Sequence, residues 1–190
     1  MIVSTSMRVI SGLFKGRRIN GGKNFSIRPT TDRIKESIFT ILGDYVSGSQ
    51  VLDLFGGSGS LGIEALSRGA EKVTFIEQQA SSIAIMKKNI HQVGIIPGKF
   101  EIIQSEVLHF CSHTPATYDI ILADPPFHYP PLQKLIATIT SRSVLNERGV
   151  LIIEHEISNP LEENTATYSI IKQKKYGRSL VSFIMRSHHE

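Results

Sequence analysis

The stretch Val-Leu-Asp-Leu-Phe-Gly-Gly-Ser-Gly-Ser-Leu-Gly, residues 51–62, decides the fold. It begins with a mostly apolar run that is typical of a buried strand, and it ends with residues that open a helix. Glycines between a strand and a helix allow positive φ angles and let a ligand approach the backbone at the helix N-terminus. Gly57, Gly59 and Gly62 match the spacing G-x-G-x-x-G, which favours a nucleotide-containing ligand without choosing among the nicotinamide, flavin and adenosylmethionine classes.

Two acidic residues narrow the choice of ligand. Glu77 follows the apolar run 72–76, about 20 residues beyond the strand–turn motif, where an acid binds ribose hydroxyls. Asp53 precedes the glycines, where it would repel a pyrophosphate but would suit the ammonium group of a methionine moiety. The alternative for Asp53 is a structural role, in which its carboxylate accepts hydrogen bonds from loop amides. Together the two acids favour S-adenosylmethionine.

A second motif, Asp124-Pro125-Pro126-Phe127, closes the apolar run 118–123. Two prolines end the strand and fix φ, which makes a rigid corner with a carboxylate, backbone carbonyls and an aromatic ring. Such acceptors can draw the lone pair of an exocyclic base amine out of conjugation while Phe127 stacks on the flipped base. The alternative is a proline-rich turn without a catalytic role. The motif predicts methyl transfer to a base amine, with these four residues as the catalytic ones.

Basic residues are concentrated near the N-terminus. Residues 1–35 contain eight basic residues and one acidic residue, so the rest of this chain of net charge +4 carries −3. A basic arm on an acidic domain is typical of a protein that binds phosphates, and a solvated basic surface is the alternative. A smaller basic cluster within 172–178 fits either RNA contact or a charged hairpin edge.

Length and composition indicate a single globular unit. The chain has 190 residues, of which 41% are hydrophobic, and this suffices for a substantial core. No apolar run approaches the roughly 20 residues that cross a bilayer, residues 1–7 do not resemble a signal peptide, and Cys111 has no disulfide partner. We therefore expect a cytoplasmic protein with no membrane partner. The seven histidines lack a ligand pattern, so no metal is expected.

Strand and helix signals alternate along the chain. Predicted strands lie near 50–54, 72–76, 100–103, 118–123 and 149–154. Predicted helices lie near 60–67, 80–92 and 131–141, and another begins after Asp32 and ends before Gly43. This alternation predicts an α/β fold with a mostly parallel sheet covered on both faces. The runs 167–171 and 179–185 predict a closing antiparallel hairpin, and residues 8–27 predict a small β-hairpin.

Four segments, in this order, resemble the bacterial 16S rRNA (guanine-N2)-methyltransferase family, of the small-subunit rRNA methyltransferase D type: 28–33, 53–59, 61–70 and 124–127. The resemblance extends from about Met7 to about Met185. Segments 28–33 and 61–70 are the more particular to this family, whereas the other two are common to many amino-methyltransferases. The chain departs from the family at Gly56, where alanine is more frequent, and at Ser105-Glu106, where related enzymes carry an acid or amide for the adenine.

The resemblance implies a Rossmann-like class I methyltransferase with a mostly parallel seven-stranded sheet, an antiparallel C-terminal strand and a small N-terminal β-hairpin extension. Residues 1–30 would form the basic hairpin extension and residues 31–190 the S-adenosylmethionine-dependent domain. The implied activity is methylation of N2 of a specific guanine in 16S rRNA, within a small ribosomal subunit or its assembly intermediate, by a monomer. Alternatives are an adenine-N6 or cytosine-N4 methyltransferase acting on DNA or RNA, a nicotinamide-dependent reductase, and a non-catalytic RNA-binding assembly factor.

The motifs and the resemblance together define two further sets of site residues. The expected cofactor-binding residues are Asp53, Phe55, Gly56, Gly57, Ser58, Gly59, Glu77, Gln78, Ser105 and Glu106. The expected RNA-binding residues are Arg8, Arg17, Arg18, Arg28, Thr30 and Arg33.

Overall fold

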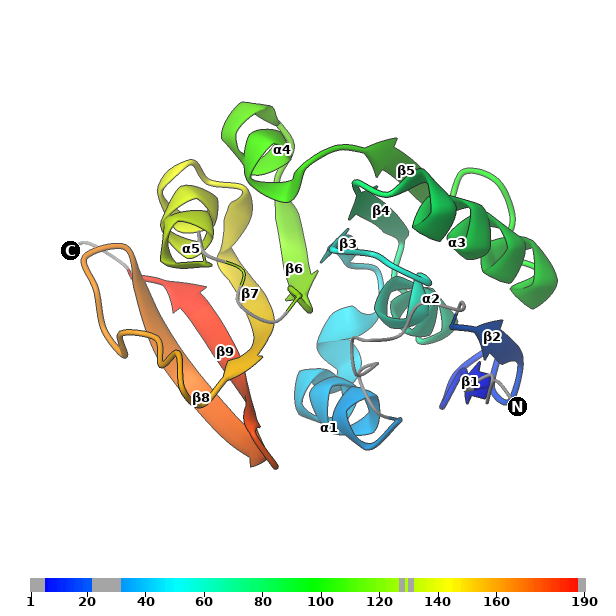
Figure 1. Ribbon diagram of the computed structural model, residues 1–190, viewed down its shortest axis with the longest axis horizontal. Helices are drawn as coiled ribbons and strands as arrows, with labels where there is room; N and C mark the ends of the chain where they lie inside the picture. The colour runs from blue at the N-terminus through cyan, green and yellow to red at the C-terminus, as the bar shows by residue number, and fades with distance from the viewer. Residues whose placement is uncertain (1–5, 22–31, 127–128, 130–131, 188–190) are drawn as a thin grey trace.

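A seven-stranded sheet forms the centre of the protein in a computed structural model that describes residues 6–21, 32–126, 129 and 132–187 (Figure 1). The strands are β3 (Gln50–Leu54), β4 (Lys72–Glu77), β5 (Phe100–Gln104), β6 (Tyr118–Ala123), β7 (Leu145–Glu156), β8 (Tyr168–Tyr176) and β9 (Ser179–Arg186). Their order across the sheet is β5-β4-β3-β6-β7-β9-β8. The first five strands in that order are parallel, and β9 is antiparallel to both of its neighbours. The predicted mostly parallel sheet with a closing antiparallel hairpin is confirmed.

Helices cover both faces of the sheet. The helices are α1 (Asp32–Leu42), η1 (Gly43–Val46, a 3-10 helix), α2 (Ser60–Ser67), α3 (Ala80–Val93), α4 (Val107–His113) and α5 (Leu132–Ser141). Val51 and Ile120 pack with the apolar residues of α1, α2 and α3. The next residues along the same strands, Leu52 and Ile121, pack with α4 and α5. This alternation follows from the two-residue period of a strand and explains why the central strands are apolar throughout.

Helix α4 and the start of strand β7 differ from the sequence-based prediction. Helix α4 was not predicted, and its first turn is capped by Glu106, a residue that is also expected to bind the cofactor. The Glu106 carboxylate accepts hydrogen bonds from the backbone N–H groups of Leu108 and His109. Strand β7 begins at Leu145 rather than near 149, and its pairing with β6 shifts register after Tyr118.

The N-terminal hairpin packs onto the same core as the sheet. It consists of β1 (Ser6–Arg8) and β2 (Arg18–Asn20), which pair in antiparallel fashion with Met7 opposite Ile19. The hairpin has apolar residues on one face, and these are buried in the cluster that contains Phe39 of α1. They are Met7 of β1, Ile19 of β2 and Val9, which directly follows β1. The predicted hairpin is therefore confirmed as an element of the fold, and its apolar residues are buried in the cluster that also contains residues of α1, α2 and α3.

The third glycine of the motif brings α2 close to the sheet. A Cβ atom added at Gly62 would lie 2.2 Å from Cε1 of Phe75 and 2.8 Å from Cγ1 of Val73, both in β4. Every residue of α2 is buried. This close approach lets the first turn of α2 reach the edge of the sheet where β3 ends. Within the described ranges, no helix is long and apolar enough to cross a membrane.

We expect Gly62→Ala to lower the free energy of unfolding. Overpacking costs about 1–3 kcal/mol, and the 2.2 Å contact with the buried Phe75 ring places this site toward the upper end. Alanine gains roughly 1 kcal/mol over glycine in a helix, so the net loss should be about 1–2 kcal/mol. Urea unfolding of Gly62→Ala, Phe75→Leu and the double variant measures the coupling. Strictly additive effects would show that the ring does not oppose the new methyl group.

Candidate active site

The glycine-rich turn between β3 and α2 lies where three strands end. Leu54, the last residue of β3, pairs with Ile76 of β4 and with Ala123 of β6. The chain turns to one side of β3 to form β4 and later to the other side to form β6. This arrangement is a topological switch point, and open α/β sheets bind their ligands outside the carboxyl ends of the strands at such a point. The structure thus brings the glycine-rich motif after β3 and the Asp-Pro-Pro motif after β6 to the same edge of the sheet, where the parallel strands have their carboxyl ends.

The turn itself has an unusual backbone. Phe55, Gly57 and Gly59 have φ angles of 61°, 52° and 82°, a region that glycine adopts freely and that costs other residues of order 1–3 kcal/mol. Hydrogen bonds fix this path, since the Gly56 N–H donates to the Ile76 carbonyl at 2.9 Å and the Gly59 N–H donates to the Gly56 carbonyl at 2.7 Å. The first of these bonds holds the turn against β4.

Alanine at Gly56 would place Cβ 2.7 Å from Cε of Met86 in α3. Because that atom is the far end of a flexible side chain, the more frequent alanine of related sequences requires only a shift of Met86.

Glu77 holds the turn with both carboxylate oxygens. Its Oε2 accepts the Gly57 N–H at 2.8 Å, and its Oε1 accepts the Gln79 N–H at 2.8 Å. The side chain of Glu77 is half-buried at the end of β4, whereas neighbouring Gln78 is exposed. The Gln78 carbonyl accepts a hydrogen bond from the side chain of Gln104 at 3.1 Å. Glu77 therefore lies beside the turn, as its proposed contact with a ribose requires.

Asp53 is almost completely buried, with 2% of its surface exposed. Its Oδ2 accepts the Gly62 N–H at 2.8 Å and so holds the first turn of α2. The pKa of Asp53 is raised to about 8, chiefly by burial and in smaller part by the negative charges of Asp124 and Glu77, against the lowering effect of the hydrogen bond from the Gly62 N–H. This hydrogen bond from a backbone amide is the contact expected if Asp53 has a structural role. The electrostatic influence of Asp124 and Glu77 on Asp53 means that three carboxyl groups surround the turn.

The corner after β6 is connected to the turn through Tyr129. Asp124 and Pro125 are half-buried and Pro126 is exposed. The Pro126 carbonyl accepts the Tyr129 N–H at 3.1 Å. The Tyr129 ring packs edge-on against Phe55, with centroids 5.0 Å apart and planes at 76°. Phe127, expected to stack on the base, lies outside the described residues.

Glu106 connects Tyr129 to α4. Its Oε1 accepts the Tyr129 hydroxyl at 2.9 Å in addition to the Leu108 N–H, and its Oε2 accepts the His109 N–H. Burial by itself would raise the pKa of Glu106, but these hydrogen bonds outweigh it, and the pKa is lowered. Ser105 lies next to it, with its N–H donating to the Glu77 carbonyl at 3.2 Å. Tyr129 was not among the expected site residues, and only its position after the Asp-Pro-Pro-Phe motif could have indicated it.

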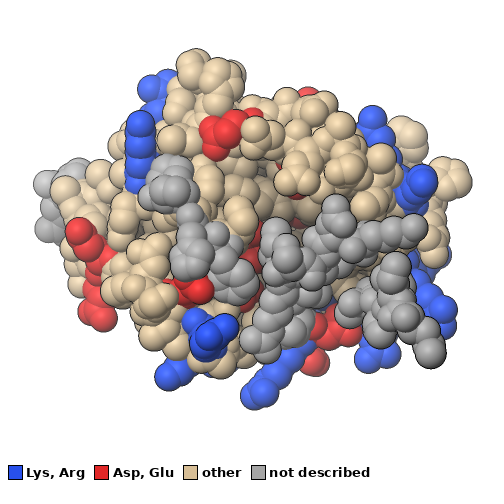
Figure 2. Space-filling model, in the orientation of Figure 1, with Lys and Arg blue, Asp and Glu red and all other residues tan. Residues whose placement is uncertain are grey.

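The described arginines expected to bind RNA are exposed, but they differ in their contacts. Arg17 donates to the Val93 carbonyl of α3 and stacks over the Phe14 ring at 5.1 Å, so it also holds the hairpin in place. Arg8 and Arg18 lie directly opposite each other on the exposed face of the hairpin. Figure 2 shows lysine and arginine side chains mainly around the rim of one face of the molecule.

The opposed pair Arg8 and Arg18 is unfavourable by itself, because like charges directly across a ladder repel. The Asp32 carboxylate, 3.6 Å from Nε of Arg8, offsets only part of this charge. Arg33 is exposed in the first turn of α1. Arg28 and Thr30 lie outside the described residues. Across the described part of the chain, no three His, Cys, Asp or Glu side chains are grouped to hold a metal ion.

The pKa of Asp53 predicts a pH-dependent stability. With a folded pKa of about 8 and an unfolded value of about 3.9, Asp53 retains a proton on folding between these two pH values. Its stabilising contribution is therefore complete below about pH 4 and is lost as the pH rises to about 8. Asp53→Asn keeps an acceptor for Gly62 without this titration. As the pH rises from about 4 to about 8, the unfolding free energy of Asp53→Asn relative to wild type should rise by up to about 1.4 kcal/mol per pH unit. The difference should level off above about pH 8. A pH-independent difference in urea unfolding would contradict the raised pKa.

Comparisons with known proteins agree with this architecture. A solved structure from Escherichia coli, described as a candidate methyltransferase, superposes with a TM-score of 0.85 and is 30% identical, covering 95% of this chain and 98% of that one. "Ribosomal RNA small subunit methyltransferase D" of Haemophilus influenzae is 35% identical over 90% of this chain and 89% of its own. The Escherichia coli protein of the same name is 31% identical over 92% of this chain and 87% of its own.

The match to a protein family covers nearly the whole chain. Residues 7–185 match the family described as Conserved hypothetical protein 95, and the predicted methyltransferase-type fold is confirmed by the superposition on the Escherichia coli structure. The resemblance on which the sequence-based expectations rest is also confirmed, since the relatives at 31% and 35% identity carry the small-subunit methyltransferase D name. This chain belongs to the Conserved hypothetical protein 95 family and to the family of the ribosomal RNA small subunit methyltransferases D.

Proposed function

We propose that this protein methylates the exocyclic N2 amine of a guanine in 16S rRNA, with S-adenosylmethionine as the methyl donor. The observation that carries the proposal is the convergence of Asp53, Glu77 and Asp124 around a glycine-rich turn at the switch point of the sheet. A ligand that binds there must tolerate three carboxyl groups. Dinucleotides bring a pyrophosphate to this turn, so the carboxyl groups disfavour the nicotinamide alternative.

The residues at the turn fit the parts of adenosylmethionine. The ammonium and sulfonium groups of the donor are cationic, and a cation beside Asp53 would offset the burial that raises the pKa of that carboxyl group. Glu77 is placed for the ribose hydroxyls, as an acid at the end of the second strand of the motif is in dinucleotide folds. The backbone of Gly57 and Gly59 lets the methionine part lie close to the turn. Bound there, the donor supplies an electrophilic methyl group.

The corner after β6 would hold the acceptor. The Asp124 carboxylate and the Pro125 carbonyl would accept hydrogen bonds from the guanine amine, and Phe127 would stack on the base. The amine nitrogen forms a bond to the methyl carbon as the carbon–sulfur bond breaks and its electrons pass to sulfur. The proton that the amine loses passes to the Asp124 carboxylate. Alignment of the two reactants in this way can supply several kcal/mol of the barrier.

The relatives favour rRNA over the other acceptors. An Asp-Pro-Pro-Phe corner can hold any exocyclic amine, so the geometry of the corner alone leaves adenine-N6 and cytosine-N4 as second candidates. The names of the relatives specify ribosomal RNA of the small subunit. The opposed Arg8 and Arg18 support a phosphate-bearing partner, because a phosphate between them would relieve their repulsion. We extend the proposal to action in the cytoplasm, as a monomer, on the small subunit or its assembly intermediate.

Asp124→Ala should abolish methyl transfer and leave donor binding nearly intact. In the proposed role the carboxylate holds the target amine, and loss of one preorganised polar contact typically costs about 10²–10³ in rate. The rate is measured as tritium transfer from adenosylmethionine to rRNA of cells that lack the enzyme, and donor affinity is measured by calorimetry. A donor affinity within a few-fold of wild type serves as the control for folding. Near-native transfer by the variant would remove Asp124 from the proposed role.

Arg8→Ala combined with Arg18→Ala should weaken RNA binding and reduce its salt dependence. Each lost phosphate contact lowers the slope of log K against log salt by about 0.7–0.9, so the pair should lower it by about 1.4–1.8. Lys87→Ala with Lys88→Ala, on the exposed face of α3, removes the same charge and serves as the matched control. Equal slopes for both double variants would indicate a non-specific charge effect rather than contact at the hairpin.

A further inference from the structure

Asn89 connects the N-terminal hairpin to the glycine-rich turn. It lies in α3 with none of its surface exposed. Its Nδ2 donates to the carbonyl of Asn20 in β2 at 2.9 Å and to the carbonyl of Ser58 in the turn at 2.8 Å. Its Oδ1 accepts the Asn20 N–H at 2.9 Å. A side-chain amide has two donors and one acceptor atom, so each of its polar atoms is used in this connection.

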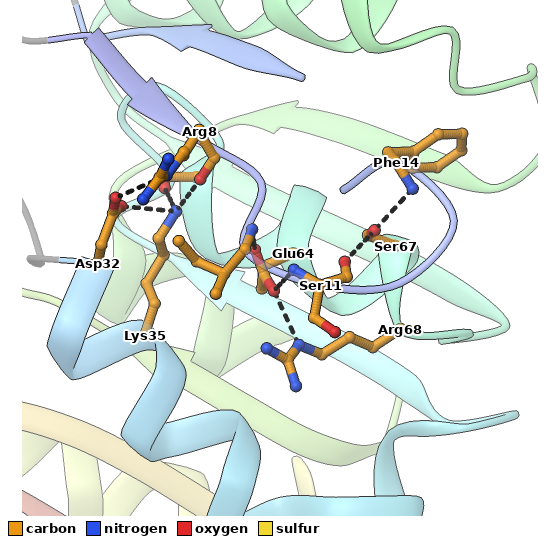
Figure 3. A network of polar contacts seen from close by, with 10 residues as sticks. Arg8, Ser11, Phe14, Asp32, Lys35, Glu64, Ser67 and Arg68 are labelled. Atoms are coloured by element: carbon orange, nitrogen blue, oxygen red, sulfur yellow. Dashed lines mark hydrogen bonds and ion pairs between the residues drawn. The ribbon is translucent and has the colours of Figure 1, made fainter. Parts of the chain in front are cut away.

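Lys35 makes a second connection, to the first residue of α2, which directly follows the turn. Its ammonium group is fully buried and donates to the carbonyl of Arg8 in β1 at 2.8 Å and to Oγ of Ser60, the first residue of α2, at 3.0 Å. The Asp32 carboxylate lies 3.7 Å away and supplies a counter-charge. Figure 3 shows Lys35 reaching from α1 toward Arg8 and Asp32. Each strand of the hairpin is thus bonded, through one buried side chain, to the α2 end of the turn.

A third contact between the hairpin and the fold does not involve the turn. Ser67, near the end of α2, accepts the Phe14 N–H at 3.0 Å and donates to the Ser11 carbonyl at 2.5 Å. Figure 3 shows these contacts beside those of Glu64 and Arg68. Ser67 resembles Asn89 in being buried, uncharged and bonded to the backbone of the N-terminal segment. A substitution of Ser67 therefore weakens the docking of the N-terminal segment without removing a hydrogen bond to the turn.

We propose that Asn89 is a positioning residue for the methyl donor, and that the hairpin supports the glycine-rich turn as well as carrying the RNA-binding arginines. The inference rests on the proposed function, in that the turn is taken to bind adenosylmethionine. Ser58 lies between two residues with positive φ angles, Gly57 and Gly59, so its carbonyl direction is not set by regular secondary structure. The Asn89 amide sets that direction, and the hairpin sets the position of the Asn89 amide.

Calorimetric titration with adenosylmethionine tests this assignment in the full-length wild type, Asn89→Ala and Ser67→Ala. Thermal unfolding of the same three proteins measures the stability lost in each variant, and titrations are performed well below every melting temperature. We expect both variants to be destabilised, but only Asn89→Ala to raise the dissociation constant for adenosylmethionine, by tenfold or more. Its kcat at saturating donor should stay within a few-fold of wild type, because no group that touches the acceptor has changed.

A second variant keeps the test decisive if Asn89→Ala folds poorly. Asn89→Asp retains the acceptor for the Asn20 N–H and loses the donors to Ser58 and Asn20, so it should weaken donor binding in the same way. Native donor affinity in a folded Asn89 variant, or an equal loss in Ser67→Ala, would overturn the inference while leaving the proposed function intact. Failure of the wild-type protein to bind adenosylmethionine would overturn both.

Discussion

The conformation of the turn between β3 and α2 is the constraint on which the rest of the structure depends. Alternate residues of this turn, from Phe55 to Gly59, have positive φ angles, and a segment of this kind has few hydrogen bonds of its own. Acidic side chains supply further partners, since Glu77 accepts the Gly57 N–H in the turn and Asp53 accepts the Gly62 N–H in the first turn of α2. The acidic groups that stabilise the turn also determine the charge of the site.

Fold and chemistry are therefore linked through the same side chains. The parallel register that aligns the ends of β3, β4 and β6 brings Asp124 into the electrostatic neighbourhood of Asp53 and Glu77. The Glu77 and Asp124 carboxylates beside the buried Asp53 suit a cationic donor and disfavour phosphates, whereas the hairpin carries exposed arginines. Under the proposed function, RNA would be held by its backbone at the hairpin while a single base enters the acidic corner.

Most of the architecture could be predicted from local sequence, because hydrophobic periodicity and glycine positions are local signals. Residues with distant partners could not. Asn89 meets Ser58 and Asn20, which lie 31 and 69 positions away, and Tyr129 meets Glu106 across 23 positions. A signal was present for Asn89 and Lys35, since each is a polar residue on an otherwise apolar helix face, beside Ile90 and Ile34 respectively. Glu106 caps α4, and its expected contact with the cofactor stays a prediction, because the same carboxylate can cap a helix or contact a ligand.

The identity of the methylated nucleoside tests the central claim most directly. Small subunits and naked 16S rRNA from cells that lack the enzyme are incubated with the protein and adenosylmethionine, digested to nucleosides and analysed by mass spectrometry. We expect N2-methylguanosine, absent from the reaction without the protein, because the proposed role of the corner at Asp124 is to hold an exocyclic amine and the relatives are named for ribosomal RNA of the small subunit. N6-methyladenosine, N4-methylcytidine or no methylated nucleoside in either substrate would contradict it.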